Sequence, residues 1–151
     1  MKAKKRPFAW SYSRYSCFKE CPARYKYSYI DKLPDIKNKW AQRGIDIHEK
    51  AEKFLDGRIK SLPKELEKLG DKFKYLKKIQ AVPEQAWSLT SNWRTTDWKA
   101  AWLRLKIDAH FLATDERNRT RVTLIDFKTG QPRPVYDDQG HLYSTAALSL
   151  Y

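Results

Sequence analysis

The sequence predicts an α/β fold in which a mixed, mainly antiparallel sheet is flanked by helices. Helical spacing of apolar residues dominates the first half of the chain, whereas short strand-like segments follow from about residue 80. This order of helices, three strands and a final helix is typical of a layered fold built on a meander. A chain of 151 residues can bury roughly two thirds of its unfolded surface in one core, so we expect a single domain over residues 1–151.

Residues 11–33 predict two short helices or one kinked helix. Ser11 is a candidate N-cap, and Pro22 suits the first turn of a second helical segment better than a helix interior. Six aromatic residues from Tyr12 to Tyr29 alternate with Lys and Arg. Such a pattern can stack on nucleobases, although it is more typical of half-buried core tyrosines.

Two amphipathic helices are predicted between residues 40 and 79. The first, residues 40–57, has an apolar stripe at Ile47, Ala51, Phe54 and Leu55 and ends at Gly57. The second, residues 63–79, begins at Pro63, is weakened or kinked at Gly70 and has its stripe at Leu66, Leu69, Phe73, Leu76 and Ile79. His48 and Glu52 lie four residues apart beside the first stripe, which by itself is typical of an ordinary surface pair.

Strands are predicted in three segments, residues 80–90, 100–114 and 121–128. The polar loop between the last two segments is of the kind that closes a hairpin. If the turn is centred on Arg117, then Asp108 faces Asp126 across the antiparallel pair and Leu112 faces Val122. The hairpin therefore predicts two carboxylates that lie face to face.

Alternation along the last strand sorts its side chains by face. Asp126 and Lys128 point to one side of an extended strand, while Ile125 and Phe127 point to the other. Like charges that face each other destabilise a sheet, so the negative charges of Asp108 and Asp126 must be neutralised, either by Lys128 or by a hard divalent cation. A third interpretation leaves both acids solvated or paired with basic side chains of the same strands, namely Arg104, Lys106 and Lys128.

Composition indicates the partner but not the chemistry. The chain has 31 Lys and Arg against 18 Asp and Glu, a formal net charge of +13. Such a field favours polyanions, most simply nucleic acid, and suits an enzyme and a binding protein equally. No segment approaches the roughly 18 apolar residues of a membrane span, so we expect no membrane association and a cytoplasmic protein, in the host cytoplasm if the gene belongs to a phage.

Four motifs occur in an order that resembles the RecB-like branch of the PD-(D/E)xK nuclease superfamily. They are "RGIDIH" with Gly44 and His48, "KIDAHF" with Asp108, "LIDFKTG" with Asp126 and Lys128, and "QGHLYSTAA" with Gln139 and Tyr143. The resemblance spans most of the chain. It implies a restriction-endonuclease-like core, a DNA substrate and a divalent metal cofactor.

Family resemblance also implies the ligands of that metal. His48, Asp108, Asp126 and the main-chain carbonyl of Phe127 would bind Mg²⁺ or Mn²⁺. Lys128 would orient or deprotonate the attacking water. Hydrolysis of a phosphodiester needs an activated water and neutralisation of developing phosphoryl charge, and a carboxylate-bound divalent ion can provide both.

Four further residues receive supporting roles from the resemblance. Gln139 and Tyr143, one helical turn apart, would help to hold DNA or to position Lys128. Glu84 occupies the place of a further acid on the first strand, and Glu52 lies one turn after His48. We treat Glu52 and Glu84 as second-tier site residues.

Two departures from the family pattern bear on the prediction. Some members bind an iron–sulfur cluster through one N-terminal and three C-terminal cysteines, whereas only Cys17 and Cys21 are present here, so we expect no cluster. Their spacing predicts buried structural thiols instead. The chain also stops at Tyr151, inside the predicted final helix, so that it is either a minimal version or lacks C-terminal elements.

The sequence therefore predicts a Mg²⁺- or Mn²⁺-dependent deoxyribonuclease, plausibly an exonuclease of recombination, repair or phage DNA processing. A catalytically silent nucleic-acid-binding module on the same fold is the alternative. A nucleotide-phosphate enzyme lacks support because no phosphate-loop spacing follows Lys128. The substrate is single- or double-stranded DNA, and a homo-oligomer or a recombination or replication partner is left open.

Overall fold

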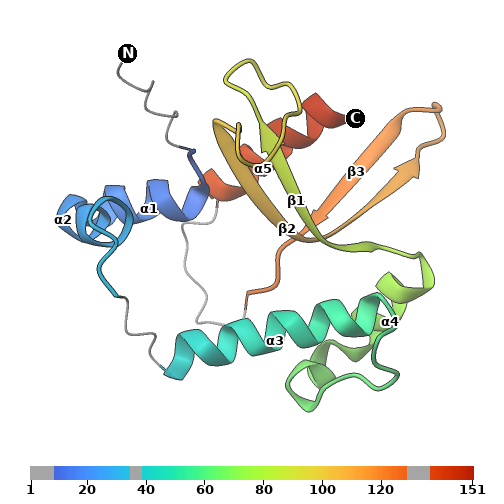
Figure 1. Ribbon diagram of the computed structural model, residues 1–151. Helices are drawn as coiled ribbons and strands as arrows, with labels where there is room; N and C mark the ends of the chain where they lie inside the picture. Colours follow the sequence, from blue (N-terminus) through green and yellow to red (C-terminus); the bar gives the residue numbers. More distant parts are fainter. Residues whose placement is uncertain (1–8, 35–38, 129–136) are drawn as a thin grey trace. The chain divides into compact units, whose positions relative to one another are not determined.

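The structure is a computed structural model that describes residues 9–34, 39–128 and 137–151 (Figure 1). Its contacts divide the chain into two compact units. The first unit comprises residues 1–36, 86–105 and 137–150, and the second comprises residues 37–85 and 106–136 together with Tyr151. The expected single domain over residues 1–151 stays a prediction.

The strands form one three-stranded sheet in the order β1-β2-β3. They are β1 (Val82–Leu89), β2 (Leu103–Thr114) and β3 (Thr120–Ile125). The last two strands pair antiparallel, and Trp10 adds an isolated parallel bridge to Leu103. The predicted α/β class with a mainly antiparallel sheet is confirmed.

In the first unit, short helices cover residues 12–30. They are α1 (Tyr12–Glu20), α2 (Pro22–Tyr25) and a π-helical turn, η1 (Lys26–Ile30). The Ser11 hydroxyl accepts a hydrogen bond from the backbone N–H of Arg14, and Pro22 occupies the first turn of α2, as predicted. The prediction of two buried thiols is wrong, because Cys17 is only partly buried and Cys21 is exposed, where it caps α2 and accepts the N–H of Arg24 with its sulfur.

The first unit also contains α5 (Asp137–Leu150), the end of β1 and the start of β2. Its fully buried side chains include those of Leu89, Leu103, Leu105 and Ala146. Lys19 of α1 and Asp138 of α5 form an ion pair at 3.4 Å. Within the described ranges, none of the helices combines the length and the apolar character that a membrane span requires.

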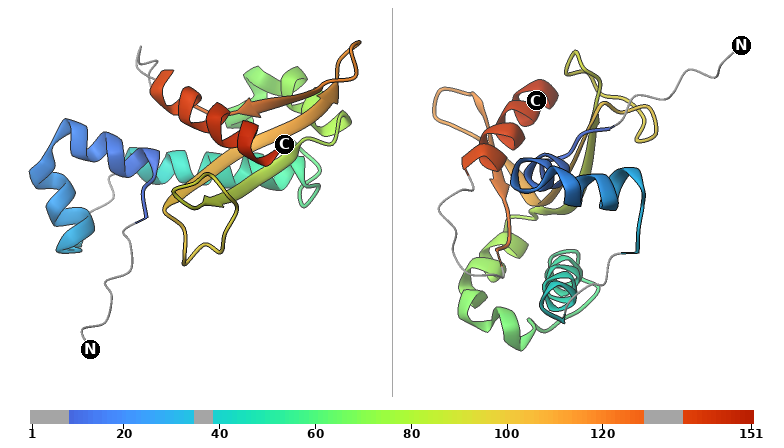
Figure 2. Two further views of the ribbon diagram at one scale, coloured as in Figure 1. Left: turned by 90° about the horizontal axis from the view of Figure 1, so that it is seen from above. Right: turned by 90° about the vertical axis from the view of Figure 1, so that its left-hand side faces the viewer.

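In the second unit, α3 (Lys39–Leu55) packs beside the segment formed by η2 (Lys64–Leu69), a 3₁₀-helix, and α4 (Gly70–Lys78), as both views of Figure 2 show. All four residues of the predicted α3 stripe are buried, namely Ile47, Ala51, Phe54 and Leu55. Gly57 follows α3 with φ +84°, a conformation that glycine adopts without strain. Gly70 marks the change from 3₁₀- to α-helix, in line with the predicted kink.

The core of the second unit lies between these helices and the sheet. Its buried members are Ile47, Ala51, Phe54, Leu55, Leu66, Phe73, Leu76, Ala81 and Ala109, and Phe127 and Ile125 pack against them. Leu69 was predicted to join this core but is 43% exposed, because it lies at the junction of η2 and α4 and borders an open cavity. The core thus fixes α3 against the hairpin that carries the acidic residues.

The register of the β2–β3 hairpin agrees with the prediction. Leu112 pairs with Val122, and the ladder continues to Ala109 opposite Ile125. A turn closes the hairpin, in which Asp115 N donates to Arg119 O at 3.0 Å. The register places Asp108 and the residues after Ile125 at the same end of the hairpin.

Candidate active site

β3 ends at Ile125, one residue before Asp126. The expectation that Asp126 and Lys128 belong to the strand is wrong, because β3 stops at Ile125. The reason lies in the next hydrogen bond, in which the N–H of Phe127 donates to the carboxylate of Asp108 at 2.6 Å. A side chain of β2 thus takes a donor that would otherwise continue the ladder.

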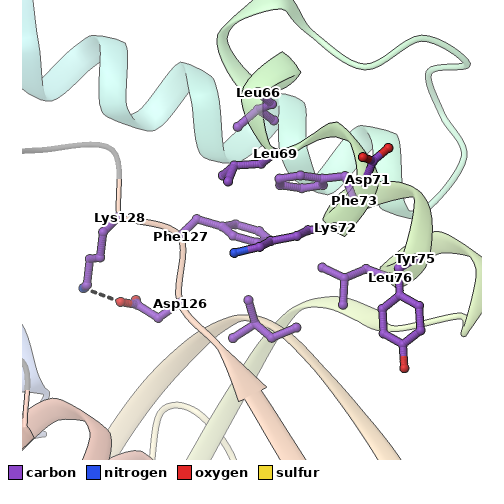
Figure 3. A pocket seen from close by; sticks show the side chains of 11 residues that line it. Leu66, Leu69, Asp71, Lys72, Phe73, Tyr75, Leu76, Asp126, Phe127 and Lys128 are labelled. Carbon is purple, nitrogen blue, oxygen red and sulfur yellow. Dashed lines mark ion pairs between the residues drawn. The ribbon is translucent and has the colours of Figure 1, made fainter.

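Alternation of side chains nevertheless persists beyond the strand. The ring of Phe127 packs on that of Phe73, with centroids 5.1 Å apart. Figure 3 shows Asp126 and Lys128 together on the side away from this ring contact. The apolar residue therefore anchors the segment to the core while its two charged neighbours share another face.

Asp108 is the centre of the hydrogen-bond network. Its Oδ1 accepts from Nδ1 of His48 at 3.2 Å, while its Oδ2 accepts from the N–H of Phe127. The side chains of His48 and Asp108 are only 34% and 20% exposed. This arrangement joins α3, β2 and the segment after β3 at one point of the second unit.

The electrostatics of His48 follow from these contacts. The hydrogen bond to Asp108 raises the pKa of His48 above its usual value, and the negative charge of Asp126 adds to the effect, although partial burial opposes it. A raised pKa favours the protonated ring, which donates to the carboxylate. The edge of this ring also faces Phe127, with centroids 6.1 Å apart.

Lys128 and Asp126 form a direct ion pair, with Nζ 2.5 Å from Oδ2. Their side chains are about one third exposed, at 37% and 34%. In the structure, Lys128 therefore neutralises one of the two acids, which is one of the possibilities considered from the sequence. The other basic candidates point elsewhere, since Lys106 pairs with Glu84 at 2.8 Å and Arg104 donates to the carbonyl of Trp98.

A cavity of about 500 Å³ opens beside His48 and Asp108. Both second-tier acids line it, Glu84 in its pair with Lys106 and Glu52 in an ion pair with Arg58. The other lining residues are Ala41, Gly44, Ile45 and Glu49. Glu84 has a φ of +26°, an unfavourable backbone conformation of the kind that is often retained at functional sites.

A second cavity, of about 620 Å³, borders Phe127 (Figure 3). It is lined mainly by apolar side chains of η2 and α4, namely Leu66, Leu69, Phe73, Tyr75 and Leu76. Asp71 and Lys72 add charge to its wall, and Asp126 and Lys128 border it. The segment that contains Asp126 and Lys128 is therefore accessible from this cavity, whereas His48 and Asp108 line the first one.

Gln139 and Tyr143 lie one turn apart on α5, as predicted from their spacing. Both belong to the first unit, whereas His48, Asp108, Asp126 and Lys128 all belong to the second. The geometry within the second unit therefore brings together four of the predicted residues and Phe127. The roles of Gln139 and Tyr143 stay predictions.

The donor chemistry of the site suits a divalent cation. Two carboxylates and an imidazole are ligands that Mg²⁺ or Mn²⁺ accepts, and here each carboxylate has a cationic or N–H partner from the protein. In the described part of the chain, no three His, Cys, Asp or Glu side chains are gathered as a complete ligand set. Asp126 faces Lys128 instead.

Comparison with known proteins agrees with this fold. The family model of the PD-(D/E)XK nuclease superfamily matches residues 9–121, three quarters of the chain, and the chain belongs to this superfamily. Its three strands and surrounding helices are the α/β fold of restriction-endonuclease type. The match includes His48 and Asp108 and ends before Asp126. No curated protein and no solved structure matches the chain significantly.

Lys106 was considered from the sequence only as a charge partner of the two acids, and its place in the wall of the cavity beside His48 was not predicted. It belongs to the same face of β2 as Asp108, two positions away, and its pair with Glu84 forms part of the cavity wall. Strand alternation could have indicated it. The bond between Asp108 and the N–H of Phe127 had no sequence signal, because any residue other than proline supplies that donor.

Proposed function

We propose that the chain is a metal-dependent deoxyribonuclease of the RecB-like branch, acting as an exonuclease in recombination, repair or phage DNA processing. One observation carries the proposal: in a chain of a nuclease superfamily, Asp108 links His48 to the segment that presents Asp126 and Lys128. Acid, imidazole and ammonium groups therefore meet beside two open cavities.

The ligands of the proposed metal are His48, Asp108, Asp126 and the carbonyl of Phe127. A bound Mg²⁺ or Mn²⁺ would supply charge neutralisation at the phosphoryl oxygens and a more acidic water. The bonds from His48 and from the N–H of Phe127 hold the Asp108 carboxylate in one orientation. Such preorganisation limits the rearrangement that binding requires.

Lys128 is the proposed partner of the attacking water. Its ammonium already lies at hydrogen-bond distance from Asp126, so a water beside that carboxylate would be within reach of the same group. Gln139 and Tyr143 are proposed to contact DNA or to position Lys128. Glu52 and Glu84 are proposed as supporting acids of the cavity beside His48.

A catalytically silent binding module is the second candidate. The direct pair of Lys128 with Asp126, together with the two hydrogen bonds to Asp108, satisfies both carboxylates by protein groups alone. Such a site can persist as a structural network on a basic protein. Single- or double-stranded DNA is the proposed partner in both cases, and a cytoplasmic location and a homo-oligomer or recombination partner stay predictions.

The test is incubation of end-labelled linear DNA and closed circular DNA with the protein in Mg²⁺, Mn²⁺ or EDTA. The exonuclease proposal expects shortened linear products with metal, an intact circle and no cleavage in EDTA. The Asp126→Asn variant, purified in the same way, controls for contaminating nuclease. Binding of both DNAs without cleavage under any condition would support the silent module and reject the enzyme.

A further inference from the structure

Trp93 occupies an unusual position at the tip of the β1–β2 connection. The N–H of Trp93 donates to the carbonyl of Thr90 at 3.0 Å, and the N–H of Thr90 donates to the carbonyl of Arg94 at 2.8 Å. These bonds close a tight turn in which Trp93 has a φ of +58°. That left-handed position in a hairpin turn favours glycine or asparagine, and a bulky aromatic residue there is an outlier.

The chain contains the same turn a second time, with an ordinary residue at that position. In the β2–β3 loop, Asn118 donates to the carbonyl of Asp115, and the N–H of Asp115 donates to the carbonyl of Arg119. Asn118 has a φ of +56°, almost equal to that of Trp93. The tryptophan is therefore not required by the turn, and it persists in spite of its backbone cost.

Trp93 lines a cavity of about 440 Å³ within the first unit. Four other aromatic residues line this cavity, namely Trp10, Tyr12, Tyr15 and Trp102, and Trp10, Tyr15 and Trp102 are 37%, 43% and 36% exposed. The other polar residues of the lining are Ser11, Asp138 and His141. We call Trp93 and these four residues the aromatic pocket. Accessible indole and phenol rings favour a flat ligand that stacks.

The lining of the aromatic pocket includes the acid Asp138, but basic side chains near the pocket and the charge of the whole chain favour a ligand that is attached to an anion. The ammonium of Lys19 lies 5.7 Å from the centre of the Tyr15 ring and also pairs with Asp138. Arg94, next to Trp93 in the turn, is exposed. The whole chain carries a formal charge of +13. A planar ring on a phosphate backbone, which is an unpaired nucleobase, meets both requirements.

We propose that the aromatic pocket binds an unpaired base of single-stranded DNA and that the turn holds Trp93 as a stacking surface. The proposal rests on the proposed function only in taking DNA as the polymer. Beyond that function, the aromatic pocket would give the protein a preference for single strands or frayed ends. Stacking needs a free base face, which a duplex does not offer, so the pocket contributes nothing to duplex binding.

The decisive variant is Trp93→Gly, because glycine suits the backbone while removing the ring. We expect the melting temperature to rise by about 2 to 4 °C. Glycine removes the backbone strain of a non-glycine residue in the left-handed conformation, and this stabilises a chain of this size. Affinity for a thymidine oligonucleotide of about 15 nucleotides, in EDTA, should fall about 5- to 100-fold, the loss expected for one stacked base. Duplex affinity should stay unchanged.

Asn118→Gly is the matched control, because it changes the same position of the other turn. It should leave both affinities unchanged. A second pair of variants, Tyr15→Leu and Tyr27→Leu, compares an aromatic residue of the pocket with an exposed tyrosine of the same unit that lies outside it, and only the first should weaken single-strand binding. An oligonucleotide of equal length with abasic sugars should bind wild type and Trp93→Gly equally.

Two results would overturn the proposal. One is unchanged single-strand affinity in a folded Trp93→Gly protein, and the other is equal loss of single-strand and duplex affinity. Because all binding is measured in EDTA, absence of cleavage does not affect the outcome. A protein that prefers single strands through Trp93 but never cuts DNA would contradict the proposed nuclease and leave the aromatic pocket in place.

Discussion

Asp108 joins three segments that are far apart in the sequence. It lies 60 residues after His48 and 19 residues before Phe127, and it is hydrogen-bonded to both. The sequence predicted that Asp108 and Asp126 share one end of a hairpin, because alternation and turn position are visible in the residues. It did not predict that a backbone N–H would take one carboxylate oxygen, since main-chain donors carry no residue-specific signal.

Metal affinity should depend on both carboxylates. Asp126→Asn and Asp108→Asn keep an amide oxygen for hydrogen bonding while removing one negative charge each. In a Mn²⁺ titration followed by calorimetry, we expect Asp108→Asn to weaken binding and Asp126→Asn nearly to abolish it. Each loss should exceed the roughly 10- to 100-fold typical of removing an outer partner of a ligand.

Asp71→Asn is the control for this titration. Asp71 belongs to the wall of the neighbouring cavity but is not a proposed ligand, and it is fully exposed. Its substitution should leave Mn²⁺ affinity unchanged. Wild-type affinity in both ligand variants would remove the proposed metal site.

The β2–β3 hairpin shows how far a pattern determines an element. Its register followed from the centre of the polar loop, because a short turn fixes which residues face each other. The end of β3 could not be predicted from the loop, because the strand stops where the Asp108 side chain accepts a hydrogen bond from the N–H of Phe127. The stripe of α3 was predictable from spacing, whereas Leu69 departed from its helix pattern at the change from 3₁₀- to α-helix.

The hairpin loop is expected to contribute a pH-dependent part of the stability. The side chain of Arg119 lowers the pKa of Asp115 below its ordinary value of 3.8, and the backbone N–H groups of Arg119 and Arg117 act in the same direction. A lowered pKa in the folded state stabilises the protein above the unfolded-state pKa. That contribution is lost as the pH falls through the folded-state pKa.

Asp115→Asn should therefore lower the melting temperature at pH 7 by no more than a few degrees, because the Arg119 side chain is largely exposed to solvent. The difference from wild type should shrink as the pH is lowered toward about 3. Glu116→Gln, which removes the charge of a neighbouring acid in the same loop, is the matched control. A difference that stays constant with pH would mean that the charge of Asp115 is not the stabilising factor.

Charge, fold class and superfamily were all predictable, because each is distributed over many residues. The division into two units and the aromatic pocket were not. Trp93 looks like any loop tryptophan in the sequence, and only its backbone conformation and its neighbours Trp10 and Trp102 give it a role. The match to the family model ends at residue 121, so the proposed roles of Asp126 and Lys128 depend on the geometry of the second unit.

The net charge predicts that duplex binding is governed by salt. If binding neutralises about six phosphates, affinity for a random-sequence duplex should fall on the order of 10³-fold between 50 and 200 mM salt, with little dependence on sequence. The measurement is a salt titration by fluorescence anisotropy in EDTA. A shallow slope would contradict electrostatic binding. The residual affinity at high salt should be larger for single strands, because stacking resists salt.

The most direct test of the account concerns Lys128, whose ammonium is assigned to the attacking water and not to general DNA affinity. Lys128→Ala should keep Mn²⁺ binding and most DNA binding while single-turnover cleavage of linear DNA slows by roughly 10²- to 10⁴-fold, the effect of losing a general base or a water-orienting group. Lys74→Ala, which removes an equally charged and more exposed lysine of α4, should cut at the wild-type rate. Cleavage by Lys128→Ala at that same rate would contradict the account.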